Sequence, residues 1–242
     1  LQTYAVQKGW SSAYLLSNRH FEGLGECNIR SHMILPLGAS SEDALYQSIP
    51  KKQRNMIKKA QTQNYDISTS WIHFDAFYDI YKQHCRAKSL STKPRLYFET
   101  LKRVFGDCIT LYSALSNKEP VAGMIFLCSS HASSYLFNAS STDAQKNGVN
   151  NLLMWEAARH FHYQHQNYIE LGFSTPQSPV YQFKKRLSKD ICEQQLYGYE
   201  LIFGNLAMPN RLKNMARNKY NGILQRLSLR SFMVEDPETK LF

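Results

Sequence analysis

Residues 109–140 have the sequence ITLYSALSNKEPVAGMIFLCSSHASSYLFNAS. Three runs rich in apolar side chains lie close together in it, over residues 109–115, 121–128 and 134–140. The polar turn signal Asn-Lys-Glu-Pro at residues 117–120 separates the first two runs. Short strands at such close spacing are typical of an antiparallel meander. The centre of the chain is therefore predicted to be a β-sheet.

A strand and two helices are expected before this meander. Residues 65–71 alternate between polar and apolar side chains, which is typical of a strand. Aromatic residues then recur at helical spacing, so a helix is expected from residue 74 to about residue 87. A second helix is expected to end at Gly106, because glycine is the usual residue just past a helix end.

Further elements are expected after the meander. They are, in order, a polar loop over 141–151, a helix over 152–166, a strand over 168–173, a short helix over 180–187 and a strand or strand pair over 193–203. The order from residue 64 to residue 204 is thus β-α-α-β-β-β-α-β-α-β. This order predicts one α/β domain with a mixed, mostly antiparallel sheet flanked by helices.

The two ends of the chain have patterns of their own. Strands are expected over 13–16 and 33–37. Helices are expected before Pro50, over 51–63 and over about 210–227, and the last two are basic. No stretch approaches the roughly 20 apolar residues that a membrane span needs, and no secretory leader is recognised. The expected location is the cytoplasm, and contact with the inner face of the membrane stays open.

Basic residues are concentrated in three places on a chain whose net charge is +10. The first two clusters fall within residues 51–59 and 184–189. Between Asn205 and Val234 there is no acidic residue but six basic ones: Arg211, Lys213, Arg217, Lys219, Arg226 and Arg230. Such clusters fit a polyanionic partner, which would be RNA, a nucleotide-linked precursor or an anionic membrane surface. The alternative is a solvated basic face without a ligand.

Four short motifs resemble the FemABX family of peptidoglycan interpeptide-bridge aminoacyltransferases, within the GNAT acyltransferase superfamily. The motifs are R-N-M-I-K-K-A at 54–60, Y-L-F-N-A-S at 135–140, L-L-M-W-E-A at 152–157, and Y-I-E-L-G at 168–172 followed by V-Y-Q-F-K at 180–184. The resemblance implies a GNAT-like domain over 51–204 and a basic C-terminal helix and tail over 205–242. Residues 1–50 would then be the last part of a preceding, related domain.

The same resemblance implies roles for individual residues. Lys184 would be the catalytic cation that stabilises a negative oxygen during transfer to an amine. The implied substrate-binding residues are Phe183, Tyr181, Tyr135, Arg95 and Arg54. Against the resemblance, Asn138 replaces a glycine of the family pattern, and Ser188 and Lys189 stand where the family often has Phe-Gly.

A loop at residues 145–150, Q-K-N-G-V-N, points to a different donor. Acetyl-CoA-using GNAT enzymes carry Q/R-x-x-G-x-G/A at this place, and its backbone N–H groups hold the pyrophosphate. Gly148 fits that pattern, whereas Asn150 replaces the last small residue and would obstruct a phosphate. Asn150 is also a good helix cap. No bound cofactor is expected. Acyl-CoA would be the donor if the chain is instead an acyl-CoA-dependent N-acyltransferase.

Other kinds of chemistry find little support. The five cysteines include no C-x-x-C pair, and the histidines at 160, 162 and 165 have no evident partner ligand, so no metal site is expected. No residue is assigned as the general base; the acids nearest the motifs are Asp143, Glu156 and Glu170.

Three functions therefore compete. The first is transfer of an aminoacyl group from aminoacyl-tRNA to an amine of a nucleotide- or lipid-linked cell-wall precursor. The second is an acyl-CoA-dependent N-acyltransferase acting on a sugar or polysaccharide precursor. The third is a non-catalytic module with the same fold that binds RNA or a membrane surface.

Overall fold

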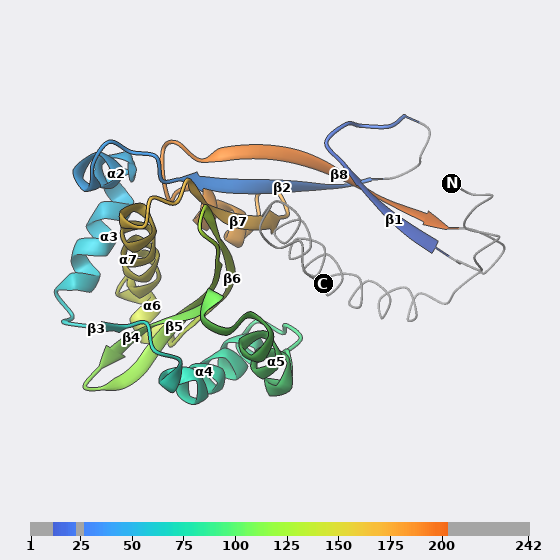
Figure 1. Ribbon diagram of the computed structural model, residues 1–242. Coiled ribbons are helices and arrows are strands. Elements are labelled where there is room, and N and C mark those ends of the chain that lie inside the picture. The colour runs from blue at the N-terminus through green and yellow to red at the C-terminus, as the bar shows by residue number, and fades with distance from the viewer. Residues whose placement is uncertain (1–11, 23–26, 203–242) are drawn as a thin grey trace. The chain divides into compact units, whose positions relative to one another are not determined.

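The computed structural model describes residues 12–22 and 27–202, and these belong to two compact units (Figure 1). Of the described residues, 12–22, 27–28 and 197–202 belong to the smaller unit, and 29–196 belong to the larger one. In the smaller unit, β1 (Ser12–Ser17) pairs antiparallel with the end of β8 (Cys192–Ile202). The predicted basic helix over 210–227 lies outside the described residues. The predicted domain boundary at residue 50 stays a prediction.

The larger unit is built on a mostly antiparallel sheet with the strand order β8-β2-β7-β6-β5-β4-β3. Its further strands are β2 (Cys27–Pro36), β3 (Asp66–Ser68), β4 (Ile109–Ser116), β5 (Glu119–Cys128), β6 (Ala132–Ser140) and β7 (Tyr168–Ser174). The predicted meander is confirmed, because β4, β5 and β6 pair antiparallel in sequence order. The predicted mixed α/β sheet is confirmed as well.

Helices flank the sheet. They are α2 (Glu42–Ser48), α3 (Lys51–Gln61), α4 (Phe74–Ala87), α5 (Arg95–Phe105), α6 (Thr142–Lys146), α7 (Val149–Tyr163) and α8 (Pro179–Lys185). The prediction of a continuous loop over 141–151 was wrong. Ser141 caps α6 by accepting a hydrogen bond from the Ala144 N–H, and α7 already begins at Val149.

Two layers of side chains hold the sheet between helices. The helix α7 is mostly apolar, and its buried side includes Phe161, whose ring lies 5.4 Å from that of Phe126 in β5. The helices α4 and α5 bring Phe77 and Phe98 into a second aromatic cluster, where Phe98 lies 4.8 Å from Phe137 of β6. Aromatic pairs of this geometry contribute roughly 0.5–1.5 kcal/mol each beyond the area they bury.

The parallel pair β6–β7 interrupts the antiparallel order and sets up the site. The two strands pair at only three positions, from Ala132↔Tyr168 to Ser134↔Glu170. No pairing continues beyond Ser134 and Glu170, although β6 runs on to Ser140 and β7 to Ser174. The two strands therefore separate after Glu170, as Figure 1 shows for β6 and β7.

A bulge lies in each of these strands close to the point of separation. In β6, Tyr135 and Phe137 pair with consecutive residues of β5, so Leu136 is left over. In β7, Glu170 and Gly172 pair with consecutive residues of β2, so Leu171 is left over. Gly172 has φ +67, a conformation that favours glycine. Bulges of this kind bend a strand and redirect its side chains.

Candidate active site

Glu170 occupies the last position of β7 that pairs with β6, and its carboxylate joins three strands. Its Oε2 accepts a hydrogen bond from Ser134 Oγ of β6 at 2.8 Å, and its Oε1 lies 3.0 Å from His32 Nε2 of β2. Burial by itself would raise the pKa of Glu170. The hydrogen bonds from His32 and Ser134, together with the charge of Lys184, outweigh burial and lower that pKa. The carboxylate is therefore ionised at neutral pH.

Lys184 lies in the last turn of α8 and is 4% exposed. The helix that carries it begins at a defined place, because Ser178 accepts a hydrogen bond from the Tyr181 N–H and Pro179 stands in the first turn. Lys184 Nζ donates to the Phe173 carbonyl at 3.1 Å. Burial lowers the pKa of Lys184 to about 8, although the charge of Glu170 acts in the opposite direction.

Phe173 connects the two halves of this cluster. Its carbonyl holds Lys184, and its ring lies 5.1 Å from the ring of His32, its cross-strand neighbour. The cluster thus contains a buried cation, an ionised carboxylate and an imidazole, contributed by α8, β7 and β2. A fixed cation can stabilise a developing oxyanion, and an imidazole can take up a proton, so the arrangement is suited to acyl transfer.

An open depression lies next to Lys185, the residue that follows Lys184. Its volume is about 530 Å³, within the range of small-molecule sites. The residues that line it are Ser31, Pro176, Lys185, Ile191, Glu193 and Gln195. Lys185 Nζ donates to Glu193 Oε2, and Tyr181 Oη donates to the same oxygen at 3.3 Å. Ser31 directly precedes His32 in β2, and successive strand residues point to opposite faces, so the depression lies on the face of β2 opposite to the His32 side chain.

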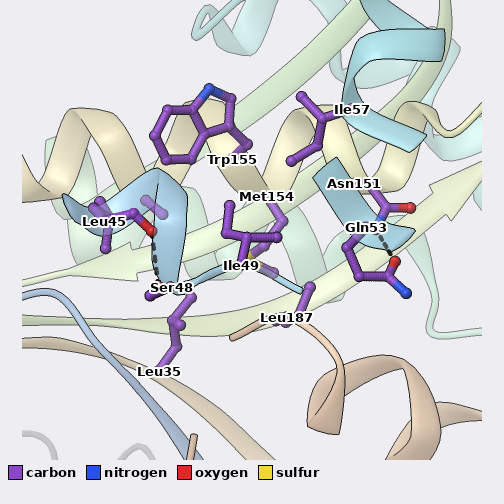
Figure 2. Close-up of a pocket in the computed structure, with 11 residues that line it drawn as sticks. Leu35, Leu45, Ser48, Ile49, Gln53, Ile57, Asn151, Met154, Trp155 and Leu187 are labelled. Carbon is purple, nitrogen blue, oxygen red and sulfur yellow. Dashed lines mark hydrogen bonds between the residues drawn. The ribbon is translucent and has the colours of Figure 1, made fainter. Parts of the chain in front are cut away.

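A second pocket, shown in Figure 2, is of a different kind. It lies among apolar residues of α2, α3 and α7, and a hydrogen bond of 2.6 Å from Asn151 Nδ2 to Gln53 Oε1 lines one side. Its volume is about 20 Å³. That is room for about one water molecule, and too little for an acyl chain or a nucleobase.

The structure brings three of the predicted residues to one region. Lys184 belongs to the cluster itself, Tyr181 reaches the open depression, and Phe183 between them is half-buried against the core. Tyr135 lies elsewhere. It follows Ser134 in β6, and successive strand residues point to opposite faces of the sheet. Its ring packs against Phe126, and burial raises the pKa of its hydroxyl.

The two predicted arginines make structural contacts in other places. Arg54 donates from Nη1 to the carbonyls of Gln47 and Ile49, at the end of α2. Arg95 forms ion pairs with Asp75 and Glu99, each at 2.6 Å, and so ties α5 to α4. None of these contacts involves the Glu170 cluster.

Gly148 and Asn150 lie at the start of α7. Gly148 has φ +83, and a Cβ atom there would come within 2.5 Å of the Met56 carbonyl oxygen in α3. The close packing of α3 therefore accounts for a glycine at position 148, and no bound phosphate is needed to explain it. Asn150 Nδ2 donates to Ser140 Oγ at 3.3 Å, while its Oδ1 is buried without a partner among the described residues.

Sequence patterns missed the pairing of His32 with Glu170. Glu170 stood among three candidate acids, but His32 was not singled out, since a single histidine at the edge of an apolar run is a weak signal. The other two acids are placed differently: Asp143 is exposed in α6, and Glu156 forms an ion pair with Arg159 in α7.

Two negative findings concern residues 12–22 and 27–202. Within these ranges, no group of three or more histidine, cysteine, aspartate or glutamate residues is placed to hold a metal ion. Over the same residues, no helix has the length and apolar character required to cross a membrane.

Comparison with known proteins adds a family and a set of related folds. Residues 48–185, more than half of the chain, match the acetyltransferase (GNAT) domain family. The structure of FemX superposes with a TM-score of 0.61 at 15% identity, over 81% of this chain and 68% of that one. L-PGS from Bacillus licheniformis gives 0.56 at 13% identity, over 89% and 75%. At these identities, the likeness concerns the fold.

A further structure, the C-terminal domain of a putative lysylphosphatidylglycerol synthetase from Agrobacterium fabrum, gives a TM-score of 0.52 at 10% identity. It is matched over 82% of this chain and 64% of that one. No curated protein sequence matches the chain.

Proposed function

Because this chain belongs to the acetyltransferase (GNAT) domain family and is an acyltransferase, we propose that it transfers an aminoacyl group from aminoacyl-tRNA to an amine of a cell-wall precursor. The observation that carries the proposal is the burial of Lys184 behind Phe173 in a GNAT-like sheet. Attack of an amine on an ester carbonyl gives a tetrahedral species with a negative oxygen. One preorganised donor to that oxygen contributes about 3–4 kcal/mol to the rate.

The related folds support an aminoacyl group as the transferred unit. A lysylphosphatidylglycerol synthetase, by its name, makes a lipid that carries a lysyl group. The motifs at 54–60, 135–140 and 180–184 resemble the FemABX aminoacyltransferases, and FemX shares the fold. An aminoacyl donor accords with both likenesses.

The start of α7 supports a donor other than CoA. In the CoA pattern, a glycine lets the loop approach the pyrophosphate closely. Here the corresponding Gly148 faces the Met56 carbonyl of α3. In addition, the Lys59 ammonium donates to the Lys146 carbonyl at 3.0 Å, so α3 is attached to this loop at a second point. The glycine therefore gives no reason to assign a phosphate here.

One observation favours the alternative, an acyl-CoA-dependent N-acyltransferase. Gly148 is the N-cap of α7 and provides no side-chain cap. The first N–H groups of α7 thus have no side-chain acceptor at the cap, and such groups attract anions. Acyl-CoA is for this reason the second candidate donor.

A comparison of donors tests the proposal. The full chain is incubated with labelled aminoacyl-tRNA or with labelled acetyl-CoA, and with a nucleotide-linked peptidoglycan peptide that carries a free amine. Transfer from aminoacyl-tRNA, lost in Lys184→Met, is expected. Transfer from acetyl-CoA alone would replace the proposed donor with the alternative. Calorimetry against ADP with added phosphate shows whether acetyl-CoA binds more tightly than a mimic of similar charge.

A further inference from the structure

Acyl transfer to an amine needs a group that removes a proton, and the proposed function already uses Lys184 as the cation that stabilises the oxyanion. An amine acceptor is largely protonated at neutral pH, and only its free form attacks a carbonyl carbon. Lys184 is a buried cation that already donates to the Phe173 carbonyl. The requirement for a base rests on the proposed function, transfer to an amine.

We infer that His32, held by Glu170, is the base that takes the proton from the acceptor amine. His32 lies in β2 between the buried residues Ser31 and Met33, and its side chain is 18% exposed. Its Nε2 faces Glu170 Oε1 at 3.0 Å. An ionised carboxylate only accepts hydrogen bonds, so the proton of the neutral imidazole is on Nε2. Nδ1 then has the free lone pair, and no described residue forms a hydrogen bond with it.

Glu170 is the positioning residue of this pair. Its second oxygen accepts from Ser134 at 2.8 Å, so the carboxylate is held at both ends and fixes the tautomer of His32. Because Ser134 bonds to the carboxylate and no bond from it to the imidazole is described, the three residues do not form a serine-nucleophile triad. The serine steadies the carboxylate, and the imidazole is the group that exchanges protons.

His32 and Lys184 lie around the same two residues. Glu170 pairs with His32 and interacts electrostatically with Lys184, and Phe173 contacts the ring of one and the ammonium of the other. Among the described residues, the charged pair Lys185–Glu193 lies beside Ser31. The proton acceptor and the oxyanion-stabilising cation thus belong to one cluster around Glu170 and Phe173.

The proposed step balances as follows. The acceptor reacts as its free amine, after its ammonium form has lost one proton to water. The amine nitrogen forms a bond to the carbonyl carbon of the aminoacyl ester, and His32 Nδ1 takes a second proton from that nitrogen. The carbonyl electrons move to the oxygen and are stabilised by Lys184. When the carbonyl re-forms, the C–O ester bond breaks, and the proton on His32 passes to the leaving hydroxyl of the donor. The products are an amide and a free hydroxyl group.

The experiment compares His32→Ala and His131→Ala with wild type over a range of pH. His131 is exposed and bonds to its neighbour Ser130, so it serves as the matched control. The donors are aminoacyl-tRNA, acetyl-CoA and a simple aminoacyl thioester, and the variants are assayed with every donor that wild type uses. Thermal unfolding confirms that each variant folds.

His32→Ala is expected to lower kcat/KM by about 100-fold or more, the usual share of a general base. It should also change the low-pH limb of the pH–rate profile, because protonation of the acceptor amine alone then sets this limb, and added imidazole should restore turnover. A folded variant that keeps the wild-type pH profile, or that imidazole does not restore, overturns the inference. If wild type transfers from acetyl-CoA alone, only the proposed donor is refuted. The role of His32 as the base is then tested by assaying His32→Ala with acetyl-CoA. No transfer from any donor overturns both.

Discussion

Replacement of Lys184 by methionine is expected to abolish transfer and at the same time to make the folded chain more stable. Methionine is close to lysine in length and fills the same space without a charge. Lys184 is almost fully buried, and among the described residues its Nζ has one hydrogen bond, to the Phe173 carbonyl. The variant therefore loses the cation needed for the reaction but no longer buries a charge.

The size of the effect follows from the pKa. Burial lowers the pKa of Lys184 from its ordinary 10.5 to about 8. At ~1.4 kcal/mol per pKa unit, the buried charge costs on the order of 3 kcal/mol of folding free energy. Glu170 loses an attraction in the variant but keeps its hydrogen bonds from His32 and Ser134. The net gain in stability is therefore expected to be ~1–3 kcal/mol at neutral pH.

The gain must depend on pH in a definite direction. Between pH 8 and 10.5 the unfolded chain holds the Lys184 proton and the folded chain releases it, so the stability of wild type rises with pH in this window. The difference between variant and wild type should be largest below pH 8 and should shrink towards pH 10. Denaturant unfolding at pH 7 and pH 10 measures this difference, and turnover measured on the same samples gives the loss of activity.

Either of two results would refute this reasoning. One is a variant that is less stable than wild type at pH 7, which would mean that Lys184 contributes more through its interactions than its burial costs. The other is turnover within about threefold of wild type, because loss of one oxyanion donor costs about 100-fold or more.

Three further predictions concern other parts of the chain. Glu170→Gln should move the loss of activity at high pH to lower pH, because the pKa of Lys184 then falls further below about 8; an unmoved limb in the pH–rate profile would contradict this. Gly148→Ala should destabilise the fold by more than ~1 kcal/mol in denaturant unfolding, whereas Gly38→Ala, where a Cβ meets nothing within 4 Å, should not. Binding of tRNA in fluorescence anisotropy should weaken steeply with salt, by a log–log slope of about −0.7 to −0.9 per phosphate contact; a flat slope would speak against an RNA donor.

The sequence predicts the order of elements well because each depends on local patterns. The three apolar runs in residues 109–140 and the spaced aromatics of α4 are such patterns, and both predictions are confirmed. The helix α6 was missed, because four of its five residues are polar and its stability comes from the Ser141 cap and from Ala144, which is buried against the core.

Only part of the candidate site could be predicted from the sequence. Lys184 stands in a recognisable motif with Phe183. The pairing of His32 with Glu170 depends on strand order and on the bulge at Leu171, which places Glu170 opposite Ile34. A register without that bulge would bring a different residue to this position. Residues 138 positions apart in the chain gave no local signal that they meet.

The pairing of β2 with β7 also bears on the order in which the chain folds. The meander of β4, β5 and β6 joins residues that are near in sequence, and such contacts form early at low entropic cost. Contacts between Ser31 and Ser174 close a far longer loop. The catalytic groups should therefore remain hydrated until this late closure desolvates Glu170 and Lys184 together. In native-state hydrogen exchange, the amides of β2 and β7 are expected to open at lower free energy than those of β5.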